Sequence, residues 1–282
     1  MRVTIRDLKR MKRDGERIPM ITAYDYTSAC LVEEAGIPLI LVGDSLGQVM
    51  LGHDSTVPVT MDDMVHHTKT VVRGTQKAHI VGDLPFLSYH TSVFDAMRNA
   101  GRLLKEGGAQ SVKLEGGQSQ AETVSRIVES GIPVMGHIGL TPQSVNQLGG
   151  YRVQGKSLKA ALQLMEDARA LEEAGAYAIV LECVPAPLAR MISERVAVPT
   201  IGIGAGAGCD GQVQVFHDLL GLYQDFVPKH ARRYANLGDA VIQATSDYIS
   251  DVRSGQFPSD KESYTLGRNV LDALTDHSTS PV

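Results

Sequence analysis

The sequence predicts a closed (β/α)8 barrel. Short apolar runs alternate with amphipathic segments along the whole chain, and eight such runs fall within about 250 residues, the usual length of this fold. Strands that are buried on both faces read as continuous apolar runs, as these do. An open doubly wound sheet, which shows the same alternation, is the structural alternative.

The expected elements follow one another at regular spacing. The apolar runs predict strands at 20–23, 39–43, 79–82, 111–114, 134–138, 178–181, 200–203 and 226–227. Helical periodicity predicts helices at 4–13, 27–35, 61–73, 92–106, 119–130 and 158–174. Four helix ends carry a Gly followed at once by an apolar run, as in EEAGIPLILV at 33–42 and EEAGAYAIVL at 172–181. Because Gly readily takes the left-handed conformation that ends a helix, each phrase indicates a helix-to-strand junction.

No linker or shift of composition divides the chain, so we predict a single barrel domain over residues 1–282. Residues 1–17 are expected to form an N-terminal capping segment with a short helix. The polar residues 275–282 are expected to form a flexible tail.

Composition excludes several classes of protein. The net charge of -5 and the interspersed charges argue against nucleic-acid binding. The three cysteines, Cys30, Cys183 and Cys209, are far apart, which argues against a disulfide framework or a CxxC metal site and favours a cytoplasmic location. The charged N-terminus lacks the apolar core of a signal peptide, and the apolar runs are too short to cross a membrane, so neither export nor membrane insertion is expected.

Four predicted strands end on an acid, namely Asp44, Asp83, Glu115 and Glu182. In this fold the C-terminal ends of all strands meet on one face, where catalytic groups lie. The first three acids follow consecutive strands, so their carboxylates could surround one cation. Oxygen ligands without clustered His or Cys favour Mg2+. The alternative is that these acids cap helices or pair with Lys and Arg.

Three further groups share this face. Lys113 and Glu115 alternate with Leu114, so both are expected on the same side of their strand. Lys113 could clamp a substrate carboxylate or form a Schiff base, and nearby acids favour the protonated clamp. Glu182, across the barrel, is a candidate general base, or alternatively a salt-bridged structural residue. His137 is the histidine that a strand end places in the predicted site.

The run GIGAGAGCDG contains GxGxxG spacing at Gly206, Gly208 and Gly211. A dinucleotide fingerprint normally opens the first βαβ unit, whereas this run follows the seventh predicted strand. We therefore interpret it as a barrel loop that binds an anionic or flat part of a ligand, or simply as a tight turn.

Long motifs identify a family resemblance between about residues 18 and 258. They are ITAYDYTSA, LVGDSLG, DSTVPVTMDDM, DLPF, VKLEGG, PVMGHIGLTPQSVNQLGGY, VLECVP, and PTIGIGAG with GCDGQV on either side of Ala207. Through these motifs the chain resembles the ketopantoate (3-methyl-2-oxobutanoate) hydroxymethyltransferase family. The resemblance implies a barrel of the phosphoenolpyruvate/pyruvate superfamily type. It also implies hydroxymethyl transfer from 5,10-methylenetetrahydrofolate to 3-methyl-2-oxobutanoate, giving 2-dehydropantoate and tetrahydrofolate in pantothenate biosynthesis.

The resemblance further implies roles for individual residues. A Mg2+-stabilised enolate would form with Glu182 as the base, and the metal would be held by Asp44 and Asp83, with Glu115 as a further ligand or an outer acid. The residues expected to bind substrate are Asp44, Ser45, Asp83, Lys113 and Tyr24. We hypothesise that His137 orients a water molecule or the new hydroxyl group. Family members form homo-oligomers, commonly homodecamers.

Departures from the family pattern are few: Ala207 replaces a common Pro, Gly82 stands where Ala is expected, and His53 and His230 replace aromatic residues. There are three alternative functions. An isocitrate-lyase-type carbon–carbon lyase would need a cysteine in a KKCGH-like loop, which the sequence lacks. A Schiff-base aldolase would use Lys113. A non-catalytic barrel is disfavoured because the set of acids is intact.

Overall fold

The computed structural model describes residues 1–278 of the chain. The chain forms two compact units, Met1–Tyr234 and Ala235–Val282, and all eight strands belong to the first. The barrel therefore occupies residues up to 234 and not the whole of 1–282. Within residues 1–278 no helix has both the length and the apolar composition needed to cross a bilayer.

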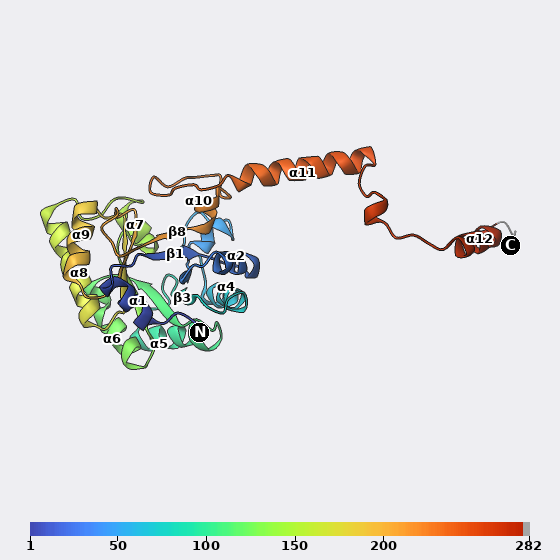
Figure 1. Ribbon diagram of the computed structural model, residues 1–282. Helices are drawn as coiled ribbons and strands as arrows, with labels where there is room; N and C mark the ends of the chain where they lie inside the picture. The colour runs from blue at the N-terminus through green and yellow to red at the C-terminus, as the bar shows by residue number, and fades with distance from the viewer. Residues whose placement is uncertain (279–282) are drawn as a thin grey trace. The chain divides into compact units, whose positions relative to one another are not determined.

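Eight parallel strands close into a barrel in chain order, which confirms the predicted fold (Figure 1). They are β1 (Ile18–Thr22), β2 (Leu39–Val42), β3 (His79–Asp83), β4 (Ser111–Glu115), β5 (Val134–Gly139), β6 (Ala178–Glu182), β7 (Thr200–Ile203) and β8 (Gly211–Gln214). The prediction of the last strand at 226–227 is wrong. Phe226 and Val227 are exposed in an irregular segment, and β8 is the sequence GQVQ. Since Gln212 is exposed and Gln214 is half-buried, β8 does not show the continuous apolar run that marks the other strands.

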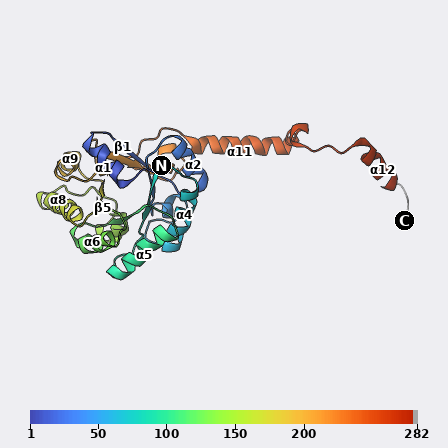
Figure 2. The ribbon, with the colours of Figure 1, turned by 60° about the horizontal axis from the view of Figure 1, so that its bottom comes forward.

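Helices surround the barrel strands (Figure 2). Six of the helices match the predicted segments within two residues: α1 (Ile5–Arg13), α2 (Tyr26–Glu34), α4 (Met61–Arg73), α5 (Val93–Lys105), α6 (Ala121–Glu129) and α8 (Leu158–Glu173). Six further helices of the described residues lie outside the predicted segments: α3 (Leu46–Val49), α7 (Val145–Leu148), α9 (Ala186–Arg195), α10 (Phe216–Leu220), α11 (Leu237–Ser254) and α12 (Arg268–Ser278). Short 3-10 turns lie at Gln118–Gln120, Pro142–Ser144 and Asp260–Glu262.

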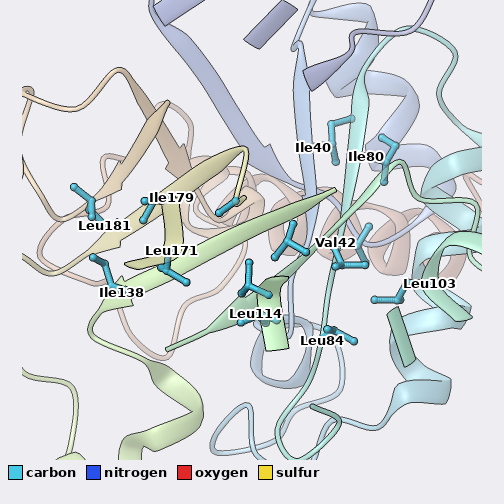
Figure 3. Close-up of a cluster of buried hydrophobic side chains, with 14 of the residues drawn as sticks. Ile40, Val42, Ile80, Leu84, Leu103, Leu114, Ile138, Leu171, Ile179 and Leu181 are labelled. Atoms are coloured by element: carbon cyan, nitrogen blue, oxygen red, sulfur yellow. The ribbon is translucent and has the colours of Figure 1, made fainter. Parts of the chain in front are cut away.

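Alternate residues of the strands build two apolar layers. The outer layer lies between strands and helices, where Leu114 packs in one cluster with Leu103 of α5 and Leu171 of α8 (Figure 3). The inner layer fills the barrel and consists of Ile18, Met20, Leu39, Leu41, Val81, Met135, Tyr177, Ala178, Val180, Ile201 and Val213, with Leu8 and Met11 of α1. The inner layer occupies the N-terminal part of the barrel together with one polar cluster, in which His79 and Tyr177 contact Ser111, whereas the inward charged residues lie at the C-terminal end.

Helix α1 caps the barrel, as predicted for residues 1–17. Its Leu8 and Met11 are buried in the inner layer. Lys12 Nζ donates to the backbone carbonyls of three residues at 2.9 Å and pairs with Asp210 at 3.0 Å. The three carbonyls belong to Ser193, Val196 and Val198. Because one ammonium group satisfies carbonyls at the end of α9, the capping segment is fixed by charge as well as by apolar packing.

The glycine-rich run is a tight crossing. Residues 204–210 join β7 directly to β8 without a helix. A Cβ at Gly206 would lie 2.4 Å from Ala186 Cβ, and one at Gly208 would lie 2.7 Å from Arg190 Cβ, both on α9. The glycines therefore allow the backbone to approach α9 closely, which supports the tight-turn interpretation of the GxGxxG spacing.

The second unit consists of α11, a 3-10 turn and α12. In α11 the large apolar residues are exposed, among them Val241, Tyr248 and Val252. Residues 275–278 of the predicted flexible tail form the end of α12, and residues 279–282 lie outside the described part of the chain.

We expect Gly206→Ala to be more destabilising than Gly36→Ala. Both positions have positive φ, +77° and +88°, so both variants place Ala in the left-handed region at a cost of about 1–2 kcal/mol. Only Gly206 also meets a neighbouring atom, which adds about 1–3 kcal/mol of overpacking, whereas a Cβ at Gly36 has nothing within 4 Å. Urea unfolding of the two variants measures the difference. Equal losses of stability would contradict the close-packing explanation.

Candidate active site

The predicted acids gather at the C-terminal end of the barrel. Asp44 follows β2, whereas Asp83, Glu115 and Glu182 end β3, β4 and β6. The first three acids are at most 5 % exposed, as are Lys113 and His137. The side chain of Glu182 is 15 % exposed, so it lies at the more open side of the group.

Lys113 forms a buried ion pair with Asp83. The two residues are register partners on neighbouring strands, and Lys113 Nζ lies 2.7 Å from both carboxylate oxygens of Asp83. Burial alone would lower the pKa of Lys113, but Asp83, Glu115 and Asp44 together raise it above its usual value. The amine is therefore protonated, which argues against Schiff-base chemistry because that chemistry requires the neutral amine.

The carboxylates destabilise one another. Burial raises the pKa of Asp44 well above its usual range, and the neighbouring Asp83 and Glu115 raise it further. Burial also raises the pKa of Asp83, although Lys113 opposes the shift. In a low-dielectric environment such groups retain a proton unless a positive charge replaces it.

His137 lies between two of the acids. Its Nδ1 is 3.4 Å from Glu115 Oε1 and its Nε2 is 3.2 Å from Glu182 Oε2. Both are ion-pair distances, but within residues 1–278 neither ring nitrogen has a partner at hydrogen-bond geometry. Burial and Lys113 lower the pKa of His137, yet the contacts with Glu115 and Glu182 outweigh them and raise it to about 9. The imidazole is therefore a cation at neutral pH.

Tyr24 and Ser45 lie together beside this group. Tyr24 is fully buried, and its hydroxyl is 2.8 Å from Ser45 Oγ. The backbone carbonyl of Tyr24 lies 2.6 Å from His67 Nδ1, which ties the end of β1 to α4. Asp25, the next residue, caps α2 by accepting a hydrogen bond from Ser28 N at 2.9 Å. Of the strand-end acids, Asp83 pairs with Lys113, as the ion-pair alternative predicted, and Asp44 accepts from Gln143.

Sequence reasoning missed Gln143 and Tyr89. Gln143 lies in the 3-10 turn after β5, and its Nε2 donates to Asp44 Oδ2 at 2.8 Å. The Tyr89 hydroxyl is 2.8 Å from Gln143 Oε1. Gln143 belongs to the long motif PVMGHIGLTPQSVNQLGGY, and a polar residue so soon after a barrel strand was the signal that could have identified it.

The backbone turns sharply after Glu182. Cys183 has a φ of +48°, a left-handed conformation that is uncommon for a residue with a side chain. Its Sγ lies 3.9 Å from His230 Nδ1, and burial raises the pKa of the thiol to about 11. Cys183 is therefore a neutral thiol and not an activated nucleophile.

The donor atoms fit Mg2+ with two carboxylate ligands. No group of three His, Cys, Asp or Glu side chains among the described residues has the geometry of a metal site. Glu115 already contacts His137 through Oε1 and accepts a hydrogen bond from Gln143 N through Oε2 at 3.1 Å. Asp44 accepts from Gln143 through Oδ2, and Asp83 pairs with Lys113 through both oxygens. Mg2+ commonly takes one or two protein carboxylates, with water and substrate completing its shell. The role of Glu115 as a third metal ligand, beside Asp44 and Asp83, stays a prediction.

The charges lead to the same conclusion. Three buried carboxylates, of Asp44, Asp83 and Glu115, are opposed by two buried cations, Lys113 and His137. One negative charge remains, and a divalent cation together with one monoanionic substrate would neutralise it.

A cavity of about 610 Å³ lies elsewhere, against β1 and β8, and none of these acids lines it.

Comparison with known proteins identifies the family. A family model described as ketopantoate hydroxymethyltransferase matches residues 2–260. The chain belongs to this family. The resemblance inferred from the motifs is thereby confirmed, and the chain is an enzyme of the transferase class, a hydroxymethyltransferase.

Relatives of the ketopantoate hydroxymethyltransferase family match almost the whole chain. A protein of Dehalococcoides mccartyi named 3-methyl-2-oxobutanoate hydroxymethyltransferase is 62 % identical, with 97 % of each chain covered. A protein of the same name from Chloroflexus aurantiacus is 65 % identical and covers 97 % of this chain and 96 % of its own.

Solved structures with low sequence identity share the fold. A phosphonopyruvate hydrolase has a TM-score of 0.61 at 13 % identity, covering 99 % of this chain and 96 % of its own. A 2,3-dimethylmalate lyase, described as a PEP mutase/isocitrate lyase superfamily member, has a TM-score of 0.60 at 16 % identity, covering 99 % and 97 %. These similarities confirm the barrel fold.

We expect Asp44→Asn to stabilise the metal-free enzyme. The folded-state pKa of Asp44 lies above its usual 3.8, so ionisation of this group destabilises the fold as pH rises through the folded value. Above that pH the Asn variant avoids the penalty, and its Tm should rise by about 2–4 °C for each kcal/mol recovered. Calorimetric scans in EDTA over a range of pH measure this. A variant with a lower Tm than the unaltered enzyme at pH 8 would contradict the repulsion argument.

Proposed function

We propose that the enzyme transfers a hydroxymethyl group from 5,10-methylenetetrahydrofolate to 3-methyl-2-oxobutanoate, giving 2-dehydropantoate and tetrahydrofolate in pantothenate biosynthesis. The family and the names of the relatives support the keto-acid substrate. The observation that carries the proposal is the buried group of Asp44, Asp83, Lys113 and Glu115 with Glu182 at its more open side. This arrangement provides separate places for charge neutralisation and for proton transfer.

Asp44 and Asp83 would hold Mg2+. When bound, the cation would act as a Lewis acid that stabilises negative charge developing on the keto acid. A related barrel, a phosphonopyruvate hydrolase, has been solved with oxalate and Mg2+, and oxalate resembles the carboxylate end of a 2-keto acid. Glu115 would act from outside the metal shell by balancing the charge of His137.

Lys113 would bind the substrate carboxylate. Its ammonium group has three N–H donors, and the two Asp83 oxygens accept from it at 2.7 Å. The ion pair neutralises Asp83 in the free enzyme and keeps the amine protonated. Ser45, 2.8 Å from the Tyr24 hydroxyl, would contribute a further polar contact to the keto acid.

Glu182 would remove the proton from C3 of 3-methyl-2-oxobutanoate. The electrons of the C3–H bond then form the enolate, whose C3 attacks the methylene carbon of the folate. A new carbon–carbon bond forms, the two carbon–nitrogen bonds to the folate break, and water supplies the hydroxyl oxygen. The two released nitrogens take up the proton removed from C3 and one proton of that water. His137, 3.2 Å from Glu182 Oε2, would orient that water or the new hydroxyl group.

We infer a homo-oligomer in the cytoplasm, with the homodecamer as the expected form. The exposed apolar residues of α11, including Val241, Tyr248 and Val252, support association because monomers rarely expose contiguous apolar surface. The three cysteines Cys30, Cys183 and Cys209 are free thiols, which suits a reducing compartment.

We expect Glu182→Gln to reduce exchange of the C3 proton of 3-methyl-2-oxobutanoate about 10²–10⁴-fold, because the amide cannot accept the proton. Exchange in D2O, followed by NMR with Mg2+ present and folate absent, isolates this step. Glu122→Gln, an exposed position on α6, is the matched control and should leave exchange unchanged. Undiminished exchange in Glu182→Gln would overturn the role of this residue as base.

We expect the enzyme to sediment with the mass of ten 30.4 kDa chains. Tyr248→Asp should lower that mass, because it places a charge among the exposed apolar residues of α11. Asp247→Asn, a polar position on the same helix, serves as the control. Sedimentation of the unaltered enzyme as a monomer would refute the oligomer.

A further inference from the structure

We propose that Gln143 is a positioning residue, whose side-chain amide holds the Asp44 carboxylate in the orientation that binds a divalent cation, while its backbone N–H holds Glu115 away from that cation. The inference rests on the proposed function, since it concerns how the same site is built. It assigns a task to a residue for which the proposed function gives none.

Gln143 connects three separate parts of the barrel end. It is 3 % exposed, and its Nε2 donates to Asp44 Oδ2 at 2.8 Å and to the carbonyl of Leu84 at 3.0 Å. Its backbone N donates to Glu115 Oε2 at 3.1 Å. One side chain from the turn after β5 thereby links the segments that follow β2 and β3, and its backbone links the end of β4.

The orientation of the amide follows from its neighbours. The Leu84 carbonyl can only accept a hydrogen bond, so the atom facing it must be the NH2 group. The Tyr89 hydroxyl is within reach of two acceptors, Gln143 Oε1 at 2.8 Å and the Glu115 carbonyl at 3.1 Å, and its shorter contact is with Gln143. Donation from Tyr89 to Oε1 agrees with the orientation that the Leu84 carbonyl fixes, in which the NH2 group faces Asp44.

This donor opposes the repulsion within the site. Asp44 is buried beside Asp83 and Glu115, and without the Gln143 donor its carboxylate would rotate away from them. The hydrogen bond at Oδ2 supports the ionised form and leaves Oδ1 for a cation. A ligand carboxylate that is itself hydrogen-bonded is a common way in which proteins orient metal ligands.

Gln143→Met tests the proposal, since it keeps the length of the side chain and removes the donor. We expect the variant to bind Mg2+ about 10–100-fold more weakly, the usual effect of losing a hydrogen bond to a metal ligand. Isothermal titration with Mg2+ alone measures affinity without turnover. Binding equal to that of the unaltered enzyme would overturn the proposal.

Two tyrosine variants separate positioning from general destabilisation. Tyr89→Phe removes the hydroxyl that orients the amide and should weaken Mg2+ binding by a smaller factor, about 3–10-fold, because Gln143 itself remains. Tyr177→Phe removes an equally buried hydroxyl, 2.9 Å from Ser111 Oγ in the inner layer, and should leave Mg2+ affinity unchanged. If Gln143→Met does not fold, this pair decides by itself. Equal weakening in both tyrosine variants, or none in Tyr89→Phe, would refute the proposal.

Failure of this inference differs from failure of the proposed function. If the unaltered enzyme neither binds Mg2+ nor exchanges the C3 proton, the proposed function fails, and the role of Gln143 fails with it. If the unaltered enzyme does both and the variants bind Mg2+ equally well, only the role of Gln143 is refuted.

Discussion

The site depends on keeping mutually repelling carboxylates buried at one end of the barrel. Asp44, Asp83 and Glu115 lie close enough to interact and are almost removed from water. Such a group is stable only because Lys113 and His137 supply opposing charge. The residual negative charge favours a divalent cation. The repulsion between carboxylates that destabilises the fold therefore also favours binding of the metal and the keto acid.

The rest of the barrel stabilises the fold against this repulsion. The N-terminal end is filled by the apolar inner layer and closed by α1, with Lys12 held on carbonyls at the end of α9. The inward charged residues thereby lie at the opposite end, where the loops after β1, β2 and β5 bring in Tyr24, Asp44 and Gln143. This division separates the part that stabilises the fold from the part that carries charge.

The acids have different neighbours and therefore different proposed roles. Glu115 is engaged by His137 and by the backbone of Gln143, which leaves it little freedom to bind a cation. Glu182 contacts the other side of the His137 ring and is the most exposed of the four acids. His137 therefore joins the carboxylate that balances charge to the one proposed to move a proton.

Most of the barrel could be predicted from sequence because parallel strands buried on both faces leave continuous apolar runs, and because such strands place their ends together. The same reasoning failed for β8, since Gln212 and Gln214 interrupt the apolar run and the exposed Phe226–Val227 imitated one. The GxGxxG spacing left two interpretations open, and only the distance from Gly206 to Ala186 supported the tight crossing.

The sequence by itself determined the fold class, the family, and which acids stand at strand ends, because these follow from local periodicity and chain order. Only the tertiary structure decided which side chains are in contact. Lys113 contacts Asp83, His137 lies between Glu115 and Glu182, and Gln143 contacts Asp44. Those contacts depend on the register of neighbouring strands and on a turn that returns across the barrel end. Residues far apart in sequence, such as Asp44 and Gln143, leave no local pattern that reveals their contact.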